Sequence, residues 1–240
     1  MPGGRFLGEA TAMSRRALLA RSLGALGAAA LGGLQAPAEA RPPEPPPLPP
    51  PLPPPLPIDV AVVALDPEPG AAPGSAPTPV RDRAWIDAQL AEAGRLFVPH
   101  GVSFALAGVR PLPGRHARLE TRGDRDALSA ELRRGVINVF VVASLRDVDD
   151  PSLLRMGVHW RHRRDPARRY VIVAATAGRS TLAHELGHYL GNPHTSVVDN
   201  LMSYQRSDGG SVFLDDKQGK RSLSTARRLL HAKELVPRAP

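Results

Sequence analysis

HELGHYLGNPH, residues 184–194, is the most informative segment of this 240-residue sequence. If it forms a helix, His184 and His188 are four residues apart, so both imidazoles leave the same face about one turn apart. Two neutral imidazoles at that spacing can bind one zinc ion, with Glu185 beside them. Gly191 can adopt a positive φ, end the helix and turn the chain back toward the metal. The closing residue, His194, is then in place as the third ligand, and the segment predicts a three-histidine zinc site.

The pattern H-E-x-x-H-x-x-G-x-x-H resembles the signature of the metzincin clan of zinc metalloproteases at every specified position. The second mark of that clan is a methionine turn beneath the metal, and the segment around Met202, residues 200–204, is similar to it. The resemblance implies Zn²⁺ held by His184, His188 and His194, with a water in the fourth position. Met202 is then a structural floor and not a ligand.

The same resemblance implies two catalytic residues. Glu185 would act as the general base that takes a proton from the attacking water and passes it to the leaving amine. Tyr204, two residues after the methionine, resembles the tyrosine of serralysins and astacins, which binds the metal at rest and swings out to stabilise the oxyanion. The alternative for Tyr204 is an ordinary packed tyrosine. In its short leader and compact length, however, the chain is more similar to small bacterial matrixin-like proteases than to serralysins or astacins.

The N-terminal region indicates export. Ser14-Arg15-Arg16 precedes an apolar run over residues 17–34 and resembles a twin-arginine motif, and Ala38-Glu39-Ala40 offers a cleavage site. We therefore expect residues 1–40 to be a signal peptide and the protein to be periplasmic or extracellular. An amphipathic or disordered leader, and an uncleaved membrane anchor, remain alternatives. Met13 is an alternative start.

Residues 41–57 are nearly all proline, which predicts an extended polyproline II linker, either a stalk or an inert spacer. The absence of cysteine excludes disulfides and thiolate ligands. The formal net charge is +8, and three lysines leave 28 of the 31 basic residues as arginine. This skew is more typical of a GC-rich genome than of a nucleic-acid binder.

The apolar pattern predicts a catalytic domain over residues 58–240. Strands are expected over residues 58–65, 102–106, 136–142, 156–160 and 170–174, and helices over residues 81–98, 124–134, 181–190 and 224–235. Ser180 is the expected N-cap of the third helix, Asp124 that of the second, and Val236 is placed inward. Residues 161–169 are expected to be a basic loop.

This order of elements is similar to the metzincin catalytic domain. We therefore expect an α+β fold whose N-terminal part has three α/β-type layers. It would contain a twisted, mostly parallel five-stranded sheet with an antiparallel edge strand, the active-site helix, the methionine turn and a C-terminal helix.

A protein or peptide substrate would pair with the edge strand near residues 157–160, and residues 212–214 would form the wall of a pocket or else belong to the core.

Asp199 is a partner for a ligating histidine or, in the interpretation that we favour, part of a turn. The remaining histidines, at positions 100, 116, 159, 162 and 231, are expected to be solvated and are given no role.

The leading hypothesis is an exported, monomeric zinc endopeptidase. It would contact a membrane only through an uncleaved signal peptide. The alternative is a zinc-containing binding protein on the same fold without proteolysis. No specific nucleic acid is expected as a partner, although the basic segment 161–169 would be the place for an anionic polymer.

Overall fold

The computed structural model describes residues 51–67, 70, 72 and 74–237, which belong to one unit, Pro49–Pro240. The expected export signal and most of the proline-rich linker lie outside the described residues. Within these residues no helix is both long and apolar enough to cross a membrane.

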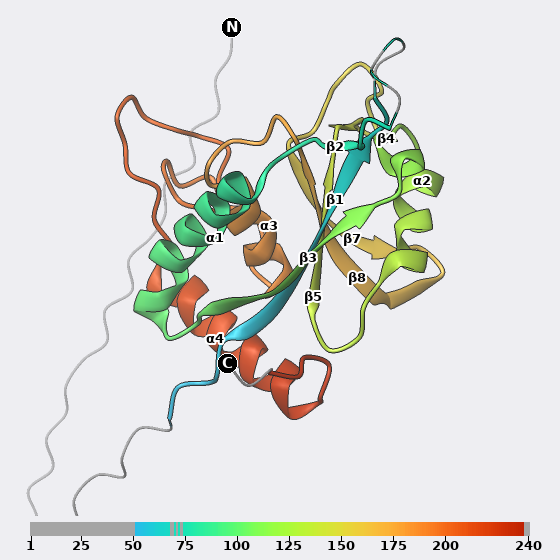
Figure 1. Ribbon diagram of the computed structural model, residues 1–240. Helices are drawn as coiled ribbons and strands as arrows, with labels where there is room; N and C mark the ends of the chain where they lie inside the picture. The colour runs from blue at the N-terminus through green and yellow to red at the C-terminus, as the bar shows by residue number, and fades with distance from the viewer. Residues whose placement is uncertain (1–50, 68–69, 71, 73, 238–240) are drawn as a thin grey trace, which may run out of the picture. The chain divides into compact units, whose positions relative to one another are not determined.

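A mostly parallel sheet forms the centre of the molecule (Figure 1). Strand β1 (Leu56–Leu65) pairs in parallel with β3 (Phe104–Leu112) on one side and with β5 (Ile137–Val142) on the other. Strand β8 (Asp165–Ala174) continues the parallel order beside β5, and β7 (Gly157–His162) closes the sheet antiparallel to β8. This arrangement confirms the predicted mostly parallel sheet with an antiparallel edge strand, but the sheet has six strands where five were predicted. A two-residue strand, β2 (Thr78–Pro79), pairs antiparallel with the end of β1.

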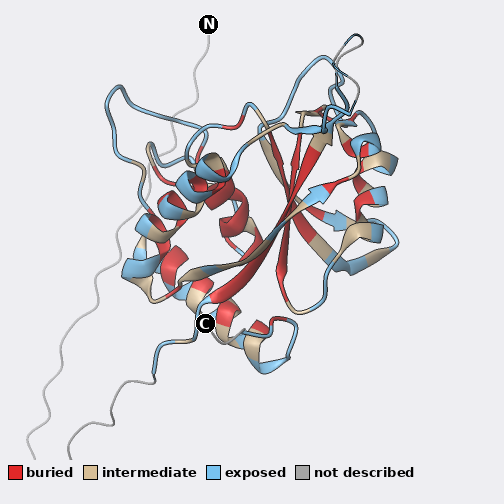
Figure 2. Cartoon of the chain, in the orientation of Figure 1, coloured by how far each residue is buried: buried red, intermediate tan, exposed pale blue. Residues whose placement is uncertain are grey.

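Alternation along the strands produces two cores, one on each face of the sheet. In β1, Val60 and Val62 belong to one cluster, whereas Ala61 and Val63 belong to the other. This is the period of two that a strand buried on both faces requires. Figure 2 shows the resulting buried centre of the sheet.

Three helices contribute to the larger core: α1 (Arg83–Phe97), α3 (Thr181–Tyr189) and α4 (Asp216–His231). The short helix α2 (Arg122–Ala127) lies on the other side of the sheet in Figure 1 and is followed by the 3₁₀ turn η3 (Leu128–Glu131). The remaining short elements are η1 (Val98–His100), η2 (Gly114–His116) and the small parallel pair β4 (Arg118–Leu119) and β6 (Ser144–Leu145).

The second predicted helix, residues 124–134, differs from the structure. Thr121 is the N-cap, and Asp124 is the third helical residue of a capping box, in which it accepts from the Thr121 backbone N–H at 2.8 Å. The α-helix ends at Ala127. Thr121 and Asp124 both have side chains that suit an N-cap, and the prediction assigned the cap to Asp124 in place of Thr121.

The last helix begins at Asp216, well before the predicted residue 224. Asp215 and Gln218 form a capping box at its start. Its first turns bury Gln218, Gly219 and Ser222 in place of apolar side chains, so they carry no hydrophobic periodicity. Val236, expected to point inward, is 52% exposed.

The expected basic loop, residues 161–169, is a β-hairpin. Arg161 pairs with Arg169 across β7 and β8, and only Arg163 and Arg164 form the turn. His162 Nδ1 accepts from the Arg164 backbone N–H at 3.2 Å. The prediction failed because the pairing depends on backbone hydrogen bonds, which a run of charged side chains on an edge strand does not reveal.

Candidate metal centre and active site

The start of α3 is fixed by a side chain from another helix. Ser180 occupies the N-cap position as predicted, but its side chain makes no capping hydrogen bond. Gln89 of α1, 2% exposed, accepts from the Leu182 backbone N–H at 3.2 Å and donates to the Gly178 carbonyl at 3.0 Å. The buried amide of Gln89 therefore pairs with an N–H in the first turn of α3, a group that the side chain of the N-cap residue usually satisfies.

The end of α3 positions the third histidine. Gly191 has φ of 91°, and its N–H donates to the His188 carbonyl at 3.0 Å. The next N–H, that of Asn192, donates to the Gly187 carbonyl at 2.9 Å, which completes a Schellman motif. Asn192 is buried and donates from Nδ2 to Ser222 Oγ of α4 at 2.8 Å. The predicted role of Gly191 is confirmed: it ends the helix and turns the chain toward His194.

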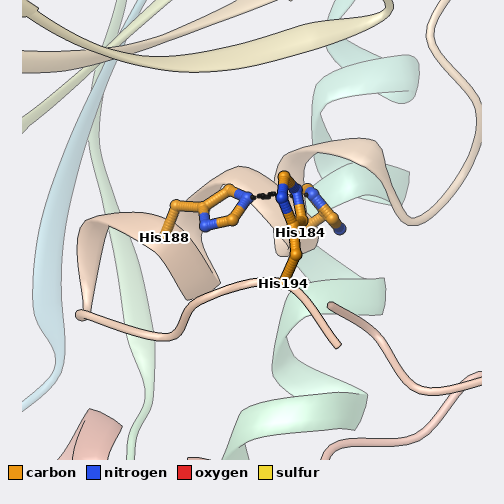
Figure 3. A group of neighbouring side chains, drawn as sticks. All are labelled: His184, His188 and His194. Atoms are coloured by element: carbon orange, nitrogen blue, oxygen red, sulfur yellow. Dashed lines mark hydrogen bonds between the residues drawn. The ribbon is translucent and has the colours of Figure 1, made fainter. Parts of the chain in front are cut away.

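Figure 3 shows the three histidine rings converging. His188 Nε2 lies 3.1 Å from His184 Nε2 and 2.9 Å from His194 Nε2. His184 Nδ1 is 2.7 Å from the Leu201 carbonyl, and His188 Nδ1 is 2.8 Å from the Asn192 carbonyl. Because a carbonyl can only accept, each of these Nδ1 atoms carries the proton and each Nε2 presents a lone pair. The Nε2 lone pairs of His184 and His188 repel each other at 3.1 Å, and a cation held between them would remove that repulsion.

The donor set fits a transition-metal ion. All three ligand atoms lie within 4.8 Å of one another. A tetrahedral ion with bonds of about 2.0–2.1 Å to nitrogen places its ligand atoms about 3.3–3.4 Å apart, close to the observed spacing. His184 is buried, His188 is intermediate and His194 is exposed, so the cluster opens toward solvent on one side. Three imidazoles suit zinc and its first-row neighbours better than calcium or magnesium.

Met202 lies directly beneath α3. Its side chain is fully buried, and a Cβ added at Gly187 would come within 2.4 Å of the Met202 sulfur. Asn200 holds this turn in place through a reciprocal amide pair with Gln218 of α4, at 2.9 and 3.0 Å. Asn200 Oδ1 also accepts from the Met202 backbone N–H at 2.9 Å. The turn therefore depends on both α3 and α4.

Asp199 belongs to the turn, as the favoured interpretation held. Its φ of 60° is left-handed, and it accepts from the Ser207 backbone N–H at 2.9 Å. The Nδ1 atoms of His184 and His188 are instead paired with backbone carbonyls.

Glu185 is 6% exposed and borders the cavities on both sides of the histidine cluster. Burial raises the pKa of Glu185 to about 8, while a backbone hydrogen bond from His159 and the charge of Arg155 act in the opposite direction. A cation on the histidines would favour the ionised form. The pKa of this carboxyl thus lies in the range of a group that exchanges protons near neutral pH.

Tyr204 lies beside the cluster, with its ring centroid 4.8 Å from that of His194 and 5.6 Å from that of His184. The side chain is 70% exposed, so it is not an ordinary packed tyrosine. Partial burial, followed by the negative charge of Glu185, raises the pKa of the Tyr204 hydroxyl. The protonated hydroxyl is therefore favoured as a hydrogen-bond donor.

Two cavities meet at the histidine cluster and share Arg155, Gly157, Glu185 and Tyr204. The larger, about 560 Å³, follows β7 as far as Arg161, and the smaller, about 370 Å³, lies beside the start of α3. A Cβ at Gly157 would lie 2.9 Å from Glu185 Cγ, so the strand comes this close to the carboxylate only because residue 157 is glycine. Within the described part of the chain, β7 pairs only with β8.

The predicted pocket wall at residues 212–214 is not found. None of these residues borders either cavity, while Val212 and Leu214 pack in the larger core. The core alternative holds for Val212 and Leu214, whereas Phe213 is 41% exposed.

Two residues at the cavities were missed by sequence reasoning. Arg155 borders both cavities and is paired with buried Asp147, which also accepts the backbone N–H of Asp149 at 2.8 Å. His159, expected to be solvated, lies on β7 with its ring 5.5 Å from the Tyr189 ring. Burial lowers the pKa of His159 to about 3, and its Nε2 has no partner among the described residues. Strand alternation places positions 157 and 159 on one face, which was the available signal.

Two further histidines differ from expectation. His116 is buried at 5% exposure, and His100 Nε2 lies 3.1 Å from the Leu214 carbonyl. His231 is exposed, as predicted.

No protein-family model matches this sequence, and no curated protein matches it. Among solved structures, the chain is similar to metalloproteinase-II from Bacteroides fragilis, with 14% sequence identity and a TM-score of 0.46. The match covers 71% of this chain and 53% of the other, so this chain spans about half the length of that protein. At this identity and score the likeness carries no functional argument.

Proposed function

We propose that this protein is a zinc-dependent endopeptidase related to the metzincins. The observation that carries the proposal is the convergence of three histidine Nε2 atoms beside a buried carboxylate, at the junction of two cavities. The proton positions inferred for His184 and His188 leave lone pairs that a cation would accept. A donor set of three histidines is one that catalytic zinc takes.

Bound zinc supplies a Lewis acid that polarises a carbonyl group and acidifies water. Glu185 takes a proton from the attacking water and returns it to the leaving nitrogen, which its raised pKa suits. Tyr204 donates a hydrogen bond to the oxygen that becomes negative during attack. Carbonyl acceptors on Leu201 and Asn192 keep the rings of His184 and His188 oriented.

The substrate is a protein or peptide in extended conformation. The outer edge of β7 offers backbone groups for an added antiparallel strand, and the larger cavity runs beside it. Such a strand would pass Glu185 where Gly157 brings the two elements together. We propose that the enzyme acts as a monomer outside the cytoplasm, reached through the N-terminal export signal.

Glu185→Gln tests the mechanism, because the amide keeps the shape of the side chain but cannot accept the proton. We expect the variant to bind one zinc ion per chain and to lose about 10²-fold or more in peptide cleavage. The measurements are metal content after dialysis and digestion of a peptide library, with a chelator added to a parallel wild-type sample.

Glu120→Gln is the matched control. Glu120 is a partly exposed carboxylate paired with Arg146, outside both cavities, and its amide variant should cleave at the wild-type rate. Wild-type activity that survives removal of the metal, or undiminished cleavage by Glu185→Gln, would refute the proposed mechanism.

A further inference from the structure

A basic pocket lies at the end of the sheet where β5 and β8 begin. This cavity of about 610 Å³ shares no residue with the two cavities at the histidine cluster. Its lining includes five basic side chains, which define the basic pocket: Arg133, Arg134, Arg168, Arg169 and Lys233. Glu234 is the one carboxylate among the described lining residues. The cavity therefore has a marked excess of positive charge.

The loop that carries two of these arginines is held rigidly by a buried amide. Asn138, 4% exposed, accepts from the Arg133 backbone N–H at 2.8 Å and donates to the Arg133 carbonyl at 2.9 Å. Gly135 adopts φ of 76°, and its carbonyl accepts from the Val236 backbone N–H at 2.8 Å. The loop before β5 is thus tied to the segment after α4. The arginines extend from a fixed backbone and not from a free loop.

Arg169 forms a fixed wall of the same pocket. Its guanidinium lies 4.7 Å from the Tyr189 ring centroid, and its Nη2 is 2.8 Å from Glu234 Oε2. Arg228 holds the other oxygen of Glu234 at 2.9 Å. Glu234 is therefore shared by Arg169, which lines the basic pocket, and Arg228, which lies outside it. Its charge does not neutralise the other four basic side chains of the pocket.

Charge in the pocket remains unneutralised. Arg133 lies 3.5 Å from Asp59, and Arg168 is 3.0 Å from the half-exposed Asp165. Arg134 and Lys233 are exposed, and neither forms a side-chain hydrogen bond or ion pair with the described residues. Two cations without counter-charges beside three paired arginines raise the electrostatic free energy, which a bound anion would lower.

We propose that the basic pocket binds phosphoryl groups of a soluble polyphosphate or of an anionic lipid headgroup. Guanidinium groups match phosphate oxygens in a bidentate geometry, and a cavity of this size accommodates several linked phosphoryl groups. The basic pocket shares no residue with the cavities at the histidine cluster, so this proposal is tested independently of the proposed peptidase activity.

Titration of the full chain with sodium tripolyphosphate, followed by calorimetry at two salt concentrations, tests the soluble ligand. Sedimentation with phosphatidylglycerol vesicles, compared with phosphatidylcholine vesicles, tests the lipid source. We expect binding in at least one of the two arms, weakening as salt rises. Arg134→Gln combined with Lys233→Gln should weaken binding on the order of tenfold or more. Thermal unfolding should be unchanged, because neither side chain has a partner to lose.

Arg118→Gln combined with Lys220→Gln is the matched control. It removes the same two charge types from exposed positions outside the basic pocket and should bind as the wild type does. Equal losses in both double variants would overturn the proposal, because binding would then reflect net charge alone. Absence of binding in both arms, or equal affinity for citrate and tripolyphosphate, would overturn it as well.

Discussion

Gly187 shows how a single residue without a Cβ allows the methionine turn to lie under the histidines. A Cβ at this position would meet the Met202 sulfur at 2.4 Å, well inside van der Waals contact. Gly187→Ala should therefore lower the free energy of unfolding by about 1–3 kcal/mol, even though alanine favours a helix. Denaturant unfolding of the metal-free protein measures the change.

Gly94→Ala is the control for this substitution. Gly94 lies within α1, and a Cβ there would meet nothing within 4 Å, so alanine should stabilise the protein by about 0.5–1 kcal/mol. Met202→Ala is itself destabilising because the side chain is buried, but it should cost less in the Gly187→Ala background than in the wild type, since the shorter side chain removes the clash. Additive losses in that double variant would contradict the proposed contact.

At the scale of elements, α1 and α3 are joined by the amide of Gln89. Its two hydrogen bonds, to the Leu182 N–H and the Gly178 carbonyl, are buried at the start of the helix that carries His184. Gln89→Ala leaves the Leu182 N–H unsatisfied, whereas the Gly178 carbonyl keeps its hydrogen bond from the Thr181 N–H at 3.1 Å, so the substitution should cost about 1–3 kcal/mol. Because α3 would fray at its start, affinity for zinc should fall too. Denaturant unfolding and a competitive zinc titration measure the two effects.

Asp87→Ala on the same helix separates this effect from a general loss of α1 stability. Asp87 forms an exposed pair with Arg83, which contributes at most about 1 kcal/mol. Its removal should leave zinc affinity unchanged. If both variants weaken zinc binding equally, Gln89 does not act through the start of α3.

How far the sequence predicted these elements depends on where their stabilising contacts lie. Strand β5 was predicted to within one residue, since its apolar run reflects burial on both faces. The start of α4 was missed because Gln218 and Ser222 are buried through hydrogen bonds to Asn200 and Asn192, far away in sequence. Ser180 was predicted correctly as the N-cap residue of α3, but a local pattern cannot reveal that the amide pairing the first turn comes from Gln89 of α1.

On the scale of the whole molecule, the candidate site was predicted where its geometry is local and missed where it is not. The spacing of His184 and His188 follows from one helix, and Gly191 supplies the turn to His194. Arg155, just before β7, and His159, within it, both border the larger cavity because the sheet places β7 beside α3. Their positions at the cavity depend on the tertiary structure. The alternation along β7 was the one sign of them in the sequence.

His116 links the stability of the whole molecule to pH. It is 5% exposed, and burial, followed by the charge of Arg115, lowers its pKa below the ordinary value of 6.5. Glu131 and Asp124 act in the opposite direction without reversing the shift. The unfolded chain therefore binds a proton at this residue more readily than the folded chain. The resulting stability is fully present above about pH 6.5 and is lost as pH falls toward the folded-state pKa.

His116→Gln removes the titrating group while keeping a polar side chain, so the free energy of unfolding should fall less steeply between pH 7.5 and 5.5 than in the wild type. Denaturant titrations at several pH values, with zinc held at one concentration, provide both slopes. The comparison isolates His116 because the metal-binding histidines are common to both proteins. His116→Asn should show the same flatter slope if the lost proton is the cause, whatever either variant does to stability at pH 7.5. Wild-type slopes in both variants would show that His116 does not couple folding to pH.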